Sequence, residues 1–262
     1  MSANSSKNST AASPRILARR MLARKPRLRA AIVAVGYLLW VFVSFIAGAL
    51  LMVLLLKTLI ALGVDYLSLS EAVRSTIEAA TAFGLSLIIA LYVPRWLFGK
   101  KTTRDELGLS RGPTWFDLLA GPLALIPYFI LAIAAVSLAQ AFIPGFDIAQ
   151  KQDVGFNAIG TRLDYSLAFI TLVVIAPIVE ETLFRGYLYG KLRPRTGMIV
   201  ASLLVSALFG FLHGQWNVGV NVFALSIVLC GLRELTGSIW AGILLHMAKN
   251  AVAFYALFVV HL

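Results

Sequence analysis

Residues 31–56 read AIVAVGYLLWVFVSFIAGALLMVLLL and contain no charged side chain. About 20 apolar residues are enough for a helix to cross the hydrocarbon core of a bilayer, so this run can span a membrane. It lacks the alternation of apolar and polar residues that is typical of a transmembrane β-strand. Because backbone groups in lipid must be paired inside helices or a closed barrel, the run predicts a transmembrane helix.

Six further apolar runs follow the first one along the chain. The seven predicted spans are 31–56, 76–94, 115–142, 164–189, 197–213, 216–233 and 237–259. Charged residues make up 13% of the chain, against about 25% in a soluble domain. The sequence therefore predicts an all-α fold, a polytopic bundle of about seven transmembrane helices that form a single domain over residues 30–262.

Positive charge is concentrated in a few segments of the chain. Residues 1–29 hold eight basic residues and no acid, and we expect them to be disordered. The loops after the second and fourth spans are also basic, which by the positive-inside rule puts the N-terminus in the cytoplasm. Basic clusters also bind nucleic acid. One that directly precedes an apolar run is typical of contact with anionic headgroups, so we expect membrane lipids as partners and no nucleic acid.

Two adjacent acids, Glu180 and Glu181, lie inside the span predicted at 164–189. A carboxylate within a membrane costs at least about 2.5 kcal/mol, so it marks a functional site by default. The alternative is a helix that ends early and leaves both acids among the headgroups. Glu181 and Arg185 are four residues apart with the acid first, the favourable order for an ion pair. Glu180 is then free to face another polar group. Pro177, three residues earlier, removes a backbone hydrogen bond, and this loss can kink the helix at the site.

Two of the three histidines, His213 and His246, lie in or at the end of apolar spans. His246 and Asn250 are four residues apart and share one helix face. Phe209 precedes His213 by the same interval and either packs or shields the site. Lys249 pairs with a carboxylate or reaches a water-filled cavity. An isolated histidine on an apolar helix is usually structural, but two near a buried acid pair favour one polar site within the membrane.

The predicted topology places His213 and Glu180 at different depths in the membrane, which is in tension with a shared site. Seven strict crossings put His213 near the outer end of its span, while Glu180 lies deeper in the membrane. A shared site then requires a tilted or longer helix, or a cavity that reaches the middle of the bilayer.

Three motifs follow one another on separate predicted helices: Glu180-Glu181-x-x-x-Arg185, Phe209-x-x-x-His213 and His246-x-x-x-Asn250. In this order they resemble the CPBP (CAAX protease and bacteriocin-processing, or Abi) family of intramembrane peptidases, over about residues 164–253. The resemblance implies hydrolysis of peptide bonds in membrane-associated or lipidated substrates, of CAAX type or in leader-peptide and bacteriocin processing. Short loops and small size suit a bacterial plasma membrane, where prenylated CAAX substrates are not expected.

Carried over residue by residue, the resemblance implies that Glu180 activates the attacking water with the help of His213. His246 and Asn250 would stabilise the oxyanion or position the water. Lys249 departs from the family pattern, in which a small or apolar residue is usual. A cation there either acts on the Glu180 carboxylate or binds an acidic substrate group, such as a C-terminal carboxylate. The supporting residues are Glu181, Arg185, Phe209 and Lys249.

The cofactor and two other functions stay open at this point. The family is usually labelled metalloprotease, and Glu180, His213 and His246 are candidate zinc ligands, because two histidines and a glutamate form a known zinc set. The HExxH arrangement is absent, and what the family implies slightly favours a metal-free, glutamate-activated water. Buried Glu, His and Lys also form ion relays in transporters, although no paired repeat is evident. A non-catalytic membrane scaffold or immunity protein is the other alternative.

Overall fold

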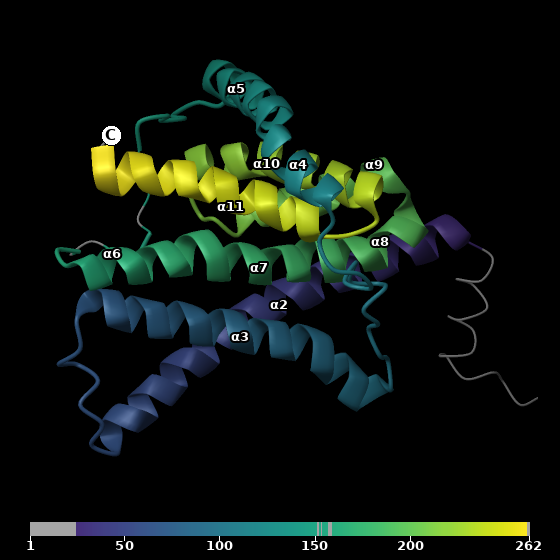
Figure 1. Ribbon diagram of the computed structural model, residues 1–262. Helices are drawn as coiled ribbons and strands as arrows, with labels where there is room; N and C mark the ends of the chain where they lie inside the picture. Colours follow the sequence, from purple (N-terminus) through teal and green to yellow (C-terminus); the bar gives the residue numbers. More distant parts are fainter. Residues whose placement is uncertain (1–24, 151, 153, 157–158, 261–262) are drawn as a thin grey trace, which may run out of the picture.

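The computed structural model describes residues 25–150, 152, 154–156 and 159–260 (Figure 1). These residues form an all-helical bundle in which no strand is described. Six of its helices are long and apolar enough to cross a membrane. The predicted fold class, a polytopic bundle of transmembrane helices, is confirmed, and the chain is an integral membrane protein. Of residues 1–29, predicted to be disordered, residues 1–24 lie outside the described residues. The prediction is wrong for residues 26–29, which form the first turn of α2 because proline is well suited to the first position of a helix.

The first two spans form an antiparallel pair. Helix α2 (Pro26–Ala61) and helix α3 (Glu71–Phe98) pack along each other. Their closest approach is at Gly48, where a Cβ atom would lie 2.8 Å from the Ala82 carbonyl oxygen of α3. Only 17% and 11% of the most apolar windows of α2 and α3 are buried within the protein. The pair therefore offers most of its surface to lipid.

The third span is made of two helices that meet at a bend. Helix α4 (Trp115–Leu123) starts with a capping box between Thr114 and Asp117 and contains Pro122, which interrupts the backbone ladder. Helix α5 (Leu125–Phe142) continues the span and packs on α10. Together they cover one side of the bundle.

One continuous helical rod over residues 162–196 runs through the centre of the bundle. Its most apolar window is 44% buried, well above the values for α2 and α3. Two stretches of it are π-helical, with hydrogen bonds from residue i+5 to residue i. Such turns are rare and occur mostly at functional sites. In order, the rod consists of α6 (Arg162–Phe169), η1 (Ile170–Ile175), α7 (Ala176–Glu181), η2 (Thr182–Leu188) and α8 (Tyr189–Thr196).

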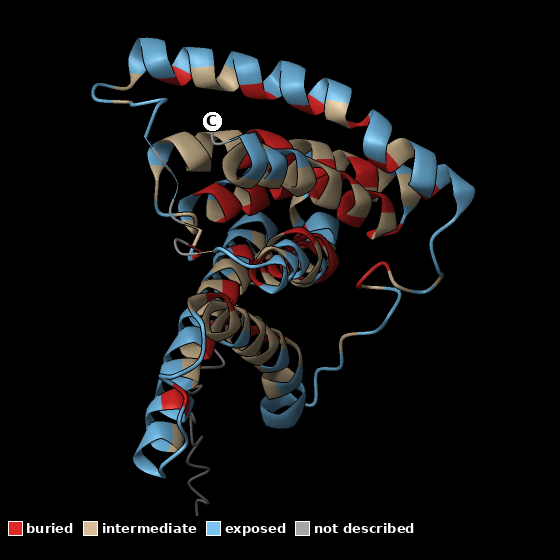
Figure 2. Ribbon diagram, turned by 60° about the vertical axis from the view of Figure 1, so that its left-hand side comes forward, coloured by how far each residue is buried: buried red, intermediate tan, exposed pale blue. Residues whose placement is uncertain are grey.

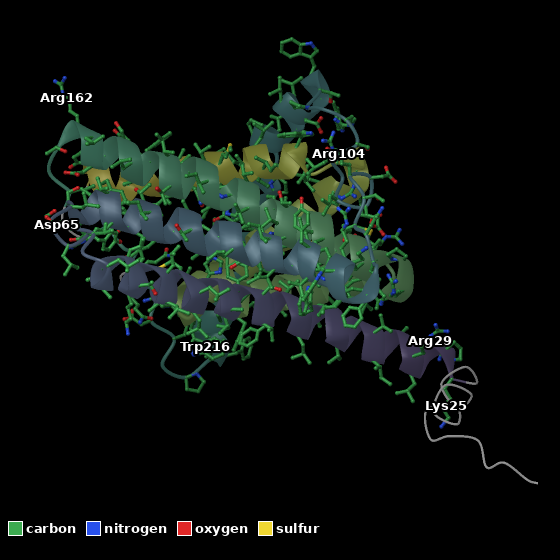
Figure 3. All side chains as sticks on the ribbon, turned by 90° about the horizontal axis from the view of Figure 1, so that it is seen from below. Lys25, Arg29, Asp65, Arg104, Arg162 and Trp216 are labelled. Carbon is green, nitrogen blue, oxygen red and sulfur yellow. The ribbon has the colours of Figure 1, made fainter. Side chains whose placement is uncertain are left out.

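The span predicted at 197–213 does not cross the bundle. Helix α9 (Met198–Phe211) has 14 residues, which is about 21 Å at 1.5 Å per residue and too short for a bilayer. The chain turns back after it, and Trp216 lies between the two ends of the molecule (Figure 3). The count of about seven spans is therefore corrected to six, because apolar composition alone does not distinguish a half-length helix from a full one.

Two more spans complete the fold. Helix α10 (Trp216–Thr236) returns along α9, and a Cβ atom at Gly210 would lie 2.7 Å from the Gly219 carbonyl oxygen, so the two backbones nearly touch. Helix α11 (Trp240–Tyr255), extended by η3 (Ala256–Val260), runs beside the central rod. Figure 2 shows the buried residues gathered on these inner helices, while the outer ones are mostly exposed.

The two ends of the bundle differ in charge. Lys25, Arg29 and Arg104 lie at one end, and Asp65 and Arg162 lie at the other (Figure 3). Ion pairs tie the basic end together: Lys191 Nζ lies 2.9 Å from Glu106 Oε1, and Arg193 Nε lies 2.6 Å from Glu234 Oε1. This distribution agrees with the predicted sidedness, and the cytoplasmic orientation of the N-terminus stays a prediction.

Candidate active site

The site begins with a backbone irregularity in the central rod. In η1 the Ala176 N–H donates to the Thr171 carbonyl, five residues earlier. In the same register the next donor would be residue 177, which is proline and has no N–H. The Leu172 carbonyl accepts instead from Asn250 Nδ2 of α11, at 2.8 Å. Pro177 thus frees a carbonyl oxygen that anchors Asn250, a role that the predicted kink did not include.

The two adjacent acids point to different surroundings, as the helical period predicts. Glu181 is fully buried, and its Oε1 accepts a hydrogen bond from Arg185 Nη1 at 3.0 Å. The predicted ion pair is therefore confirmed. The same oxygen lies 3.0 Å from His246 Nδ1, a contact that the sequence did not predict. Glu180 is only partly buried and lines an open cavity. The helix thus separates one buried carboxylate from one that faces the cavity.

A glycine on α11 makes room for the buried carboxylate. A Cβ atom at Gly242 would lie 3.0 Å from Glu181 Oε2, which has no hydrogen-bond partner among the described residues. Gly242 and His246 are four residues apart on the same face of α11. That spacing is the sequence signal that could have identified Gly242, since a glycine one turn before a site histidine allows close approach of another helix.

Phe209 packs against both the Arg185 guanidinium and the two histidine rings. The Arg185 guanidinium carbon lies 4.4 Å from the centroid of the Phe209 ring, in a cation–π contact. The same ring packs edge-on against His213 at 4.9 Å and His246 at 5.9 Å between centroids. Of the two predicted roles for Phe209, packing is confirmed, and shielding of the site stays a prediction.

The hydrogen bonds of the two histidines define which nitrogen is available. His213 Nδ1 lies 2.7 Å from the Phe209 carbonyl oxygen, which can only accept, so Nδ1 carries the proton. His246 Nδ1 is held in the same way by the Glu181 carboxylate. Nε2 of each ring is left for other partners, and His246 Nε2 lies 3.7 Å from Glu180 Oε2. Second partners of this kind orient catalytic imidazoles.

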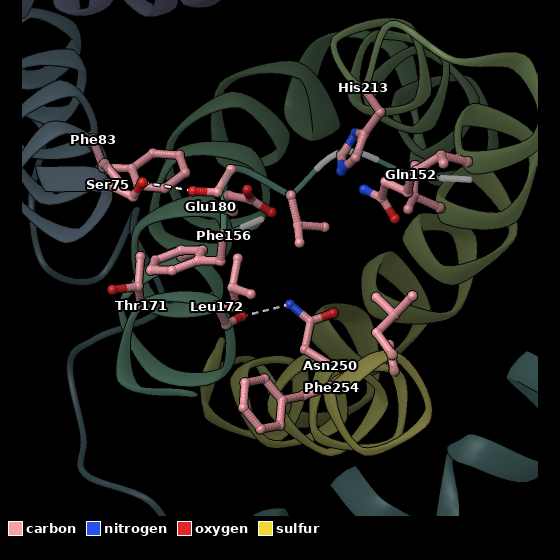
Figure 4. A pocket seen from close by; sticks show the side chains of 18 of the residues that line it. Ser75, Phe83, Gln152, Phe156, Thr171, Leu172, Glu180, His213, Asn250 and Phe254 are labelled. Carbon is pink, nitrogen blue, oxygen red and sulfur yellow. Dashed lines mark hydrogen bonds between the residues drawn. The ribbon is translucent and has the colours of Figure 1, made fainter. Parts of the chain in front are cut away.

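These groups meet at one cavity of about 420 Å³. Figure 4 shows Glu180, His213 and Asn250 directed toward the same space from the central rod, the turn after α9, and α11. His246 and Lys249 line it as well. The topological strain is resolved because α9 is short, so the turn that follows it carries His213 into the bundle rather than to its surface.

A second carboxylate, Glu78 of α3, lines this cavity beside Glu180 and was not predicted as a site residue. It lies at the edge of the second predicted span, where acids are common, so the sequence gave no reason to single it out. Its Oε1 accepts a hydrogen bond from the Tyr66 hydroxyl at 2.8 Å. Ser75, Thr171 and Gln152 add neutral polar groups to the lining.

The candidate zinc ligands do not form a ligand set in this arrangement. Among the described residues no group of three His, Cys, Asp or Glu side chains is placed to hold a metal ion. His246 Nδ1 is engaged by Glu181 at 3.0 Å, and its Nε2 lies 3.7 Å from Glu180 Oε2. We therefore derive no step through zinc.

The fold and the site together define a class, the polytopic helical membrane proteins with a carboxylate–imidazole site inside the bundle. Residues 162–252 match the family described as Type II CAAX prenyl endopeptidase Rce1-like. This segment coincides closely with residues 164–253, and the predicted resemblance is confirmed there.

Two relatives share part of the same region. The chain is 30% identical over 84 residues to "Putative membrane peptidase YdiL" of Bacillus subtilis (strain 168), covering 32% of this chain and 34% of that protein. It is 32% identical over 94 residues to "Uncharacterized 24.3 kDa protein" of Escherichia coli, covering 34% of this chain and 43% of that protein. The chain thus matches less than half the length of either relative. No solved structure matches it.

Proposed function

We propose that this protein is an intramembrane endopeptidase in which Glu180 activates the attacking water. One observation carries the proposal: a partly buried carboxylate shares a cavity inside the bundle with two oriented imidazoles and an anchored amide. Amide hydrolysis needs a base for water and donors for the developing negative charge, in a site with little bulk water. The match of residues 162–252 to a family of membrane endopeptidases supports the same reading.

The steps follow from the atoms that face the cavity. Water donates a hydrogen bond to Glu180, while the lone pair of His213 Nε2 accepts a second one and fixes the direction of attack. Glu180 takes the proton as the water oxygen bonds to the carbonyl carbon. Glu180 then gives this proton to the leaving nitrogen as the carbon–nitrogen bond breaks.

The oxyanion formed in between needs hydrogen-bond donors. The second N–H of the Asn250 amide is available, since only one is used by Leu172. When His246 is doubly protonated, its Nε2–H is a further donor, and the Glu181 carboxylate on the opposite nitrogen stabilises that charge. Removal of one such donor typically slows catalysis by about 10²–10³-fold.

The substrates that fit are peptides or proteins held at the membrane. The cavity lies within the helical bundle, so a segment already in the bilayer reaches it without crossing an aqueous phase. Both relatives named above are bacterial proteins, which supports a bacterial plasma membrane and leader-peptide or bacteriocin processing rather than prenylated CAAX substrates. The orientation with the N-terminus in the cytoplasm is part of this proposal.

The test is cleavage of a co-expressed candidate substrate by the purified protein, with Glu180→Ala and His213→Ala variants alongside. We expect Glu180→Ala to lose at least about 10³-fold in rate and His213→Ala about 10²-fold, with thermal unfolding of both close to wild type. Cleavage that persists in Glu180→Ala would sink this mechanism. Absence of cleavage by the wild-type protein, with ion flux in proteoliposomes or stable partner binding instead, would favour the transporter or the scaffold.

A further inference from the structure

Lys249 is a cation inside the membrane span α11 that has no counter-charge in contact. It forms no ion pair and no hydrogen bond with any described residue. An ammonium group at this depth is costly and generally pairs with another group or faces water. Three residues earlier, His246 already has the Glu181 carboxylate as its partner. Glu180 acts on this charge across the cavity, but no carboxylate among the described residues contacts the Lys249 ammonium.

This lysine stands where two cavities meet. The first is the catalytic cavity, of about 420 Å³. The second, which we call the lateral cavity, has about 800 Å³ and lies between α5, α10 and α11. Because the two share part of their lining, a peptide can lie across both. The shared lining residues are Gln152, Val218, Lys249, Ala253 and Leu257.

The two cavities differ in charge. The catalytic cavity is lined by the carboxylates of Glu78 and Glu180. In the described lining of the lateral cavity, Lys249 is the one charged residue, and the polar groups around it are neutral. Lys249 lines both cavities, but in the first two carboxylates compete with an anionic ligand, whereas the second offers the ammonium without a described carboxylate. The neutral polar lining residues are Ser137, Gln140, Gln150, Gln152, Asn217 and Asn221.

Two asparagines on α10 are held in place by bonds that leave capacity for a ligand. Asn221 Oδ1 accepts from the Tyr128 hydroxyl at 2.8 Å. Asn217 Nδ2 donates to the Gln150 carbonyl at 2.7 Å. Each primary amide has further donor capacity, suited to carbonyl and carboxylate oxygens of an extended peptide. The wall opposite, from α5, is largely apolar, as a segment entering from lipid requires.

We propose that Lys249 binds a carboxylate of the substrate and thereby selects peptides that carry a negative charge on the part lying in the lateral cavity. The proposal rests on the endopeptidase function above and names its substrate class. The carboxylate can come from a free C-terminus or from an Asp or Glu side chain. In either case the charge is bound beside the reacting bond, since His246 and Lys249 are one helical turn apart.

The test uses three fluorogenic peptides of one alanine, leucine and valine sequence. One ends in a free carboxylate, one in an amide, and one in an amide with an aspartate as its penultimate residue. The quantity measured is the ratio of kcat/KM between each charged peptide and the neutral amide. A charge-assisted hydrogen bond predicts a ratio of about 10 to 100 for wild type. A preference for only one charged peptide identifies the source of the carboxylate.

Variants at two lysines complete the design. Lys249→Met should bring the ratio to about 1, and Lys249→Arg should keep most of it. Lys57→Met is the matched control, because Lys57 is exposed on α2, and its ratio should equal that of wild type. Equal loss on charged and neutral peptides in Lys249→Met would mean that Lys249 acts through Glu180, and would overturn the proposal.

A binding measurement separates this proposal from the endopeptidase function. The Glu180→Gln protein in detergent should bind the free-carboxylate peptide about 10-fold or more tightly than the amide, as measured by competition against a fluorescent peptide. The Glu180→Gln, Lys249→Met protein should not discriminate. If no variant cleaves any peptide but this discrimination holds, the endopeptidase function fails and the anion site stands. Equal binding by Glu180→Gln overturns the site.

Discussion

The α2–α3 pair and the central rod of residues 162–196 are both long, apolar spans, yet they serve opposite purposes. The pair leaves most of its surface to lipid, while the rod has 44% of its most apolar window buried. The pair meets through the small residues Gly48 and Ser86, whereas the rod buries the charged pair Glu181 and Arg185 completely. Hydropathy therefore identifies both as spans, and only the burial of charge marks the one that carries the site.

The sharpest test of this contrast compares two carboxylates of the same cavity, one from each region. Glu180→Gln, in the rod, should lower kcat/KM by at least about 10³-fold because the amide cannot take a proton from water. Glu78→Gln, in α3, should change it by less than about threefold, since an amide oxygen can still accept from Tyr66. Similar losses in the two variants would remove the distinction between the regions.

The second test compares two ion pairs. Glu181→Gln should destabilise the protein by about 3–5 kcal/mol, because the buried Arg185 guanidinium would keep its charge without a carboxylate. Lys191→Met breaks a pair with the exposed Glu106 at the basic end and should cost less than about 1 kcal/mol. Unfolding free energies in detergent measure both. A comparable loss in the two variants would contradict the assignment of Glu181 as the central support.

The third test compares two glycines. Gly242→Ala should lower kcat/KM by about 10-fold, because the new methyl group pushes Glu181 and, through it, His246 out of position. Gly84→Ala in α3 is the control, since its Cβ atom meets nothing within 4 Å. We expect wild-type kinetics for that variant. Full activity in Gly242→Ala would show that Glu181 has room to move.

The smallest effect concerns pH and the loop at the basic end. Burial of the Glu106 carboxyl raises its pKa. Hydrogen bonds from the Thr103 N–H and the Lys191 ammonium lower the pKa by more, so it lies below its ordinary value. A pKa lowered in the folded state adds stability at neutral pH that is lost as the pH falls through the folded pKa.

The thermal midpoint of wild type should therefore exceed that of Glu106→Gln at pH 7, by the equivalent of less than about 1 kcal/mol. The difference should shrink below about pH 4. A difference that grows on acidification would show that Glu106 is not stabilised by these partners. No comparable change is expected for Lys57→Met.

Sequence alone was sufficient for contacts within one helix. The four-residue spacing predicted the Glu181–Arg185 pair and the common face of His246 and Asn250, because the helical period determines which side chains are neighbours. The grouping of His213 with Glu180 followed from the motif order, and the structure brings both to one cavity.

Contacts between different helices could not be predicted from the sequence. The bond from Asn250 to Leu172 joins residues 78 positions apart and exists because a π-helical register meets a proline. No periodicity predicts that coincidence. The fifth predicted span, 197–213, was counted wrongly for a related reason, since the tertiary turn after α9, rather than composition, ends that helix. The contact between His246 and Glu181 was missed because the direction in which the His246 imidazole points depends on how α11 packs on the rod.

The link between Pro177 and Asn250 also bears on biosynthesis. The rod and the turn with His213 precede α11 in the chain, so Glu180 and His213 are synthesised before the residues of α11 that contact the Leu172 carbonyl and Glu181. Docking of α11 is thus the step that completes the site that we propose. It brings Asn250 to the Leu172 carbonyl, which is free because Pro177 has no N–H, and His246 to Glu181.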